Sequence, residues 1–173
     1  MQAEHNESDK GKRERVYELL DRLGIEYGKI DHPPIFTQAE SELRPVQTDA
    51  VIFKNLFLRN KDKSSYYLYS LPLTQRADLV ALAIALGETR LSFGDERALE
   101  EKLNIQHGSV SFLNAIGAER TDVTFLIDSS VFSCERVGVH PNDNTATVTL
   151  KPQDIEGILS SCGVEYRFIS PES

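Results

Sequence analysis

The sequence contains no apolar run that approaches the ~20 residues of a membrane-spanning helix. Its first stretch, Met1 to Arg15, is polar and charged and lacks the apolar centre of a secretory signal peptide. From these absences we expect a cytoplasmic protein that has no membrane partner. A length of 173 residues with 40% hydrophobic content predicts one globular domain over residues 10–170, preceded by a disordered tail at 1–9.

Side chains typical of metal and nucleophile chemistry are also scarce. The two cysteines, Cys134 and Cys162, lack metal-ligand spacing and are expected to be free thiols. Four histidines are scattered without paired carboxylates, so no metal site is expected. The chain has neither a Gly-rich phosphate loop nor a Gly-x-Ser-x-Gly elbow. Hydrolysis through a covalent nucleophile is therefore not supported.

Basic residues are outnumbered, with 19 Lys and Arg against 27 Asp and Glu and a net charge of −8. This balance argues against broad binding to a nucleic-acid backbone, and no DNA partner is expected. One short stretch is nevertheless locally basic. It contains Lys54, Arg59, Lys61, Lys63 and Arg76. A nucleic acid touched at one end only is therefore compatible with the sequence.

Apolar periodicity alternates between strand-like and helix-like segments along the chain and predicts a mixed α/β fold. The expected strands are 25–30, 51–58, 66–71, 90–93, 123–127, 136–140, 145–150 and 164–168. The expected helices are 10–23, 78–86, 95–103 and 152–161, and a Thr-x-x-Glu capping box at 37–40 predicts a further short one.

Lys54 is the most informative residue because it lies within an apolar strand at 51–58. Alternation places it on one face with Leu56 and places Asn55 on the other face with Phe57. Burying an ammonium group without a partner is costly. Lys54 therefore either extends along Leu56 into solvent or faces a cleft that receives an anion.

A second polar cluster, His140-Pro141-Asn142-Asp143-Asn144, ends another apolar strand. Asn and Asp are ordinary turn formers, and Pro141 restricts the backbone around His140. A histidine beside such a turn could instead bind a ribose or a phosphate. The two polar clusters together suggest a pocket for an anionic or ester-bearing ligand.

Four motifs in order resemble those of the free-standing prolyl-tRNA editing proteins of the YbaK-like superfamily. They are Asp31-His32-Pro33-Pro34-Ile35-Phe36-Thr37, Lys54-Asn55-Leu56-Phe57-Leu58-Arg59, Arg90-Leu91-Ser92-Phe93 and His140-Pro141-Asn142-Asp143-Asn144-Thr145-Ala146-Thr147. The resemblance covers roughly residues 12–168 and is nearest to the branch that deacylates alanyl-tRNA(Pro).

The resemblance implies a mixed, largely antiparallel sheet wrapped by helices, without metal or organic cofactor. It implies hydrolysis in trans of the ester between a wrong amino acid and the 3′ adenosine of tRNA(Pro), with prolyl-tRNA synthetase as a further partner. Lys54 maps to the family's key functional residue. The substrate-binding candidates are Asn55, His140, Asn144, Gly108, Ser109, Val110, His32, Phe36 and Phe112.

The chain departs from the family pattern after Val110, where Thr-Pro-Phe-Gly is usual and Ser111-Phe112-Leu113-Asn114 stands instead. Amino-acid selectivity is therefore open, with alanine as the leading substrate and serine or another small side chain as alternatives. A deacylase for another tRNA, such as a seryl or threonyl one, shares the expected chemistry. A non-catalytic module that binds tRNA or a synthetase is the alternative from a different class.

Overall fold

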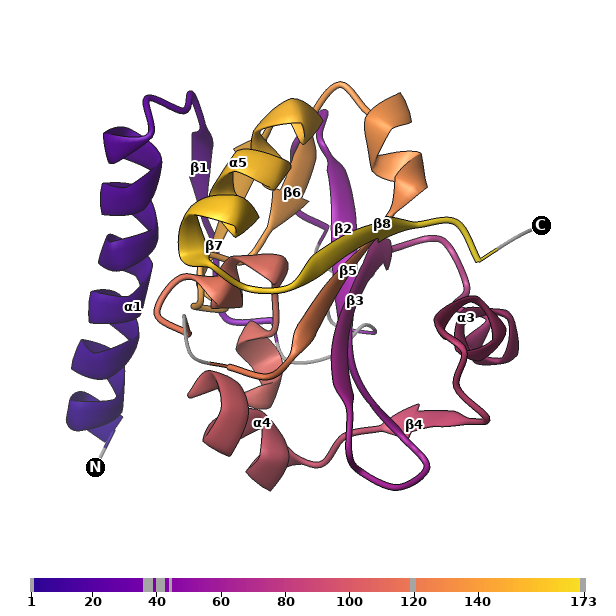
Figure 1. Ribbon diagram of the computed structural model, residues 1–173. Coiled ribbons are helices and arrows are strands. Elements are labelled where there is room, and N and C mark those ends of the chain that lie inside the picture. Colours follow the sequence, from indigo (N-terminus) through magenta and orange to yellow (C-terminus); the bar gives the residue numbers. More distant parts are fainter. Residues whose placement is uncertain (1, 36–38, 40–42, 44, 119–120, 172–173) are drawn as a thin grey trace.

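The computed structural model describes residues 2–35, 39, 43, 45–118 and 121–171, which form a mixed α/β fold on an eight-stranded sheet (Figure 1). The strands are β1 (Gly28–Asp31), β2 (Val51–Asn60), β3 (Tyr66–Pro72), β4 (Leu91–Phe93), β5 (Thr124–Asp128), β6 (Val137–Val139), β7 (Ala146–Leu150) and β8 (Tyr166–Ile169). Their order is β1-β7-β6-β2-β3-β5-β8, and β4 pairs with β2 outside this path. Four pairings are antiparallel and three are parallel, so the expected fold class is confirmed.

The helices of the described residues are α1 (Gln2–Arg22), α3 (Leu79–Leu86), α4 (Glu96–Leu103) and α5 (Pro152–Cys162), with short 3-10 helices η1 (His107–Ser109), η2 (Phe112–Ala115) and η3 (Ser129–Ser133). Local chemistry sets their ends. Asp78 and Asp95 each accept a hydrogen bond from an amide of the first turn, which caps α3 and α4. Gly87 ends α3 in the left-handed conformation, with φ of 74°. The helices expected at 78–86, 95–103 and 152–161 are confirmed.

Two predictions near the N-terminus have other outcomes. α1 begins at Gln2, so the expected helix start near residue 10 is wrong for this structure. Residues 2–9 have no apolar stripe that could hold a helix against the fold, so their disorder in solution stays a prediction. The capping box at 37–40 falls largely outside the described residues. Across the described part of the chain, no helix combines the length and apolar character needed to cross a membrane.

A hydrophobic core lies on each face of the sheet. The larger core contains buried side chains of α1, α4 and α5, such as Ile158, packed on sheet residues such as Phe125; Figure 1 shows α5 lying across β6 and β7. The smaller core packs Leu82 of α3 against the sheet. β2 serves both cores, with Phe57 in the larger and Leu58 in the smaller.

Candidate active site

Lys54 lies in the middle of β2, opposite Leu71 of β3. Its side chain is half-buried and points to the face of the smaller core, which contains Leu71 and its β2 neighbour Leu58. Burial lowers the pKa of Lys54 below its usual value. No carboxylate of residues 2–35, 45–118 or 121–171 forms a salt bridge with it. Lys54 is thus a partly desolvated ammonium group without a salt bridge among the described residues, which fits both the cleft and the solvent interpretation.

His140 directly follows β6, the strand beside β2. β6 runs parallel to β2 with Ile52 opposite Gly138, so His140 and Lys54 each follow two residues later. Ile52 and Gly138 share a face, because a Cβ on Gly138 would lie 2.6 Å from Ile52 Cδ1. Alternation therefore places Lys54 and His140 on that same face.

Hydrogen bonds define which ring nitrogen is the donor in two histidines on this face. His140 Nδ1 lies 3.1 Å from the carbonyl of Ala146 and must donate to it, which leaves Nε2 as an acceptor when the ring is neutral. His32 Nδ1 likewise donates to the Pro33 carbonyl, and Nε2 lies 2.9 Å from Thr147 Oγ1. The two rings lie 6.1 Å apart, edge to face. His140, His32 and Thr147 therefore lie close together. Alternation places Lys54 on the same face of the sheet, and these four residues are called the Lys54 face.

Acidification should destabilise the protein through His140. Burial lowers the pKa of His140 below its usual value, helped by nearby His32 and opposed by the Ala146 carbonyl and Asp143. The unfolded ring, with a pKa of about 6.5, then binds more protons than the folded one. The protein therefore keeps its full stability when the pH is above the pKa of the unfolded His140 ring. It loses part of that stability as the pH falls toward the pKa of the folded ring. Urea unfolding between about pH 8 and pH 5 should show a smaller loss for His140→Gln than for wild type. Equal losses would contradict this assignment.

The turn that follows His140 is held from α1. Asp143 Oδ1 accepts from both the amide and the hydroxyl of Thr145, each at 2.8 Å. Arg13 lies 3.8 Å from Asp143 and 3.8 Å from Asp31, and donates to Thr145 Oγ1 at 3.3 Å. Asn144 is half-buried, and its carbonyl accepts from the Ile35 amide. The structure therefore brings Asn144 and His32 to the same end of the sheet as His140.

Asn55 and Val110 belong to the opposite side of β2. Both line a cavity of about 180 Å³ between β2, β4 and the start of α4. The side-chain oxygen Oδ1 of Asn55 accepts a hydrogen bond from the Ser70 hydroxyl across the β2–β3 pair. The alternation expected from the sequence thus separates Asn55 from the Lys54 face.

The remaining predicted residues have mixed placements. Gly108 is half-buried in η1, and the Ser109 amide already donates to the Gln106 carbonyl, so that amide is not an open donor for an oxyanion. Phe112 is 0% exposed within the larger core, so its side chain offers no surface to a substrate, contrary to expectation. Phe36 lies outside the described residues.

Sequence reasoning did not include Thr147 or Arg13 among the candidate site residues, and it gave Asp143 of the predicted polar cluster no role of its own. Thr147 carried a signal, because it alternates with Thr149 on a strand paired to the one that ends at His140. Arg13 carried none, since only the tertiary fold brings α1 beside residues 143–145.

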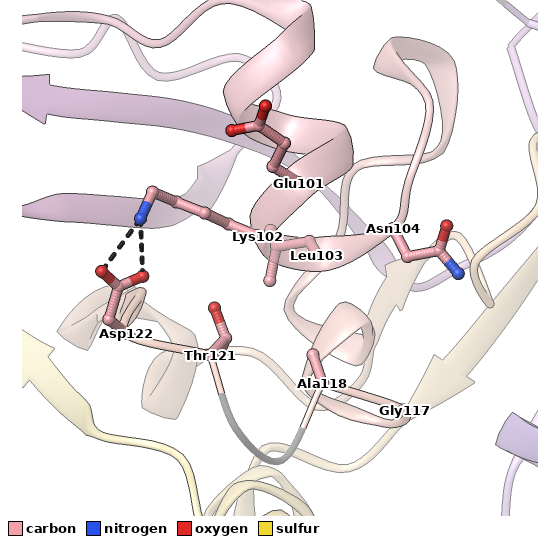
Figure 2. A pocket seen from close by; sticks show the side chains of 8 residues that line it. All are labelled: Glu101, Lys102, Leu103, Asn104, Gly117, Ala118, Thr121 and Asp122. Atoms are coloured by element: carbon pink, nitrogen blue, oxygen red, sulfur yellow. Dashed lines mark hydrogen bonds and ion pairs between the residues drawn. The ribbon is translucent and has the colours of Figure 1, made fainter.

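A cavity of about 750 Å³ lies elsewhere, between the end of α4 and residues 117, 118, 121 and 122 (Figure 2). Lys102 crosses it to form an ion pair with Asp122 at 2.9 Å. The lining contains none of the predicted site residues.

The chain is similar to known proteins over most of its length. The model of the aminoacyl-tRNA editing domain family matches residues 32–158. The prolyl-tRNA editing protein ProX of Acetoanaerobium sticklandii is 35% identical over 161 residues, covering 93% of this chain and 98% of that protein. The prolyl-tRNA synthetase associated domain-containing protein 1 of Bos taurus is 32% identical, covering 87% and 90%.

Solved structures share the fold. A crystal structure described as that of a proposed trans-editing enzyme for prolyl tRNA synthetase superposes with a TM-score of 0.67 at 17% identity, covering 92% of this chain and 96% of that one. The resemblance expected from the four motifs is confirmed, and the chain belongs to the aminoacyl-tRNA editing domain family.

Proposed function

We propose that this protein is a trans-editing deacylase that hydrolyses the ester of mischarged tRNA(Pro), with alanyl-tRNA(Pro) as its main substrate. The observation that carries the proposal is Lys54, a half-buried lysine without a salt bridge among the described residues, on one face with two histidines. The similarity to a ProX prolyl-tRNA editing protein supports the choice of tRNA. The cytoplasm, where charged tRNA is consumed, is the proposed location.

The reaction is attack of water on an aminoacyl ester. An ester is already activated, so the protein must position water and stabilise the developing oxyanion. Lys54 holds the phosphate of the terminal adenosine or that negative charge, and its partly apolar surroundings strengthen the attraction. His140 and Asn144 orient the adenosine, and the ribose hydroxyl of the substrate assists in activating water.

Selection against cognate proline is steric in this proposal. A pocket sized for alanine excludes the larger ring, whereas a synthetic site cannot reject a smaller side chain by size. Ile35 and Phe36, from the motif that contains His32, are the proposed wall residues. Phe112 is not among them, because it is fully buried.

A non-catalytic module that binds a tRNA end or prolyl-tRNA synthetase is the second candidate, and the departure at residues 111–114 is what favours it. The Lys54 face argues for the enzyme, because a binding module does not need a partly desolvated lysine on one face with two histidines.

Turnover separates the two candidates. Catalytic amounts of protein should release alanine from many equivalents of alanyl-tRNA(Pro) and leave prolyl-tRNA(Pro) charged. Seryl-tRNA, run in parallel, tests a different small side chain. Stoichiometric binding without release of any amino acid would support the module instead.

A further inference from the structure

The locally basic stretch of the sequence is divided between the two ends of the β2–β3 hairpin. Lys61 and Lys63 lie exposed in the turn that joins the strands, directly after β2 ends at Asn60. At about 3.3 Å per residue, Asn60 is about 20 Å from Lys54 along the strand. Arg76 instead follows β3, in the connection to α3, which leaves the hairpin at the end opposite the turn (Figure 1).

The connection between β3 and α3 lies on the side of the sheet to which Lys54 points. Its first residue, Leu73, donates its amide to the carbonyl of Ile52 at 2.8 Å, two positions before Lys54 in β2. Further along the connection, Ala77 packs against the smaller core. Arg76 therefore belongs to a segment that begins beside the Lys54 strand and continues over the same side of the sheet.

Asp128 holds this connection in place. It is 5% exposed at the end of β5. Its Oδ2 accepts from the Tyr69 hydroxyl at 2.7 Å and from Gln75 Nε2 at 3.3 Å, and its Oδ1 accepts from the Ser130 amide at 2.9 Å. Burial alone would raise the pKa of Asp128, but these hydrogen bonds lower it below its usual value, so the carboxylate stays charged at neutral pH. Gln75 is thus tied to a buried anion.

Arg76 is the next residue, and its side chain is exposed. No carboxylate of residues 2–35, 45–118 or 121–171 forms a salt bridge with it. Asp78, the acidic residue nearest in sequence, caps α3 by accepting from the Ala81 amide. The backbone before Arg76 is fixed, because the Gln75 amide donates to the Pro72 carbonyl at 3.0 Å. A guanidinium group on a fixed turn, without an acidic partner, is suited to bind a phosphate.

We propose that Arg76 binds a phosphate of the single-stranded 3′ end of the tRNA while the aminoacylated adenosine is held at Lys54. The inference rests on the proposed function, which supplies the RNA. Lys61 and Lys63 make no contact with the RNA in this arrangement. Gln75 is a positioning residue, because it fixes the turn that contains Arg76. A single local contact suits a chain whose net charge of −8 repels a polyanion as a whole.

The test titrates an acceptor-stem minihelix of tRNA(Pro), ending in alanine joined through a non-hydrolysable 3′ amide, into each protein between about 50 and 200 mM salt. Loss of one contact to a single-stranded phosphate should reduce the slope of log Kd against log salt by about 0.7. Arg76→Ala should show this reduction and bind roughly eightfold more weakly at the lower salt. Arg76→Lys keeps the charge and should keep the slope. A wild-type slope and affinity in Arg76→Ala would overturn the proposal.

The double variant Lys61→Ala/Lys63→Ala provides the matched control, because it removes two exposed positive charges from the far end of the same hairpin. Its slope should equal that of wild type. A reduction as large as that of Arg76→Ala, or larger, would place the RNA at the hairpin turn and overturn the proposal. A minihelix without its single-stranded 3′ end is the second control. Wild type and Arg76→Ala should bind it with equal slopes, and a persistent difference would assign Arg76 to the double-stranded stem instead.

Gln75→Ala tests the positioning role. It should weaken binding of the minihelix roughly threefold and have no effect when Arg76 is already alanine, because the contact with Asp128 acts only through Arg76. Additive effects of the two changes would overturn that role.

Binding and hydrolysis are measured separately, so this proposal and the proposed function can fail independently. If the slope depends on Arg76 but the wild type releases no alanine from alanyl-tRNA(Pro), the deacylase proposal fails and the phosphate contact stands. If the wild type hydrolyses the ester but Arg76→Ala keeps the wild-type slope and affinity, only the phosphate contact fails.

Discussion

Lys54→Ala is expected to slow deacylation of alanyl-tRNA(Pro) about 100-fold or more, the scale of losing one preorganised charge donor. The effect should appear in single-turnover rates as well as in steady state, because Lys54 is proposed to act on the substrate itself. A folded variant with a near-normal rate would remove Lys54 from the centre of the mechanism.

Lys54→Met is the informative control for folding. Methionine keeps most of the apolar stem and removes the charge. Because burial already lowers the pKa of Lys54, the charged form is disfavoured in the fold, and the variant should be at least as stable as wild type. Thermal unfolding of both proteins checks this. Lys54→Arg keeps the charge but changes the donor geometry, so it should recover only part of the rate.

Phe112→Ala is expected to destabilise the protein by about 3–5 kcal/mol, the usual range for truncating a fully buried aromatic side chain. Phe112 is 0% exposed in the core beneath η2 and contributes no described surface to the Lys54 face. Urea unfolding measures the loss. Phe112→Leu, which retains most of the volume, should fold and keep its substrate preference.

The opposite result would support Phe112 as a substrate-binding residue. If Phe112→Ala were nearly as stable as wild type and altered the choice between alanyl and prolyl esters, Phe112 would be a pocket wall.

Periodicity predicted the Lys54 strand well because the rule is local. Alternation along β2 separates Lys54 from Asn55, and the structure reproduces that separation. Side-chain caps at Asp78 and Asp95 are equally local, and both helices begin where expected. The same alternation places Asn55 on the face opposite Lys54, although both are candidate site residues.

The sequence did not predict which residues the tertiary fold buries or brings into contact. Phe112 follows a loop motif and was expected at the surface of a pocket, yet burial depends on the helices packed around it. The contacts of Arg13 and Gln75 join residues far apart in the chain, and nothing in either local sequence specifies a partner. Such pairings follow from the fold rather than from a motif.

The most direct test of the central claim is to locate the bound substrate. An acceptor-stem minihelix of tRNA(Pro), ending in alanine joined through a non-hydrolysable 3′ amide, can be titrated into labelled protein and followed by NMR. The account predicts the largest shifts at Lys54, His140, His32 and Thr147. Shifts centred instead on the cavity beside Lys102 and Asp122, with the Lys54 face unchanged, would contradict it.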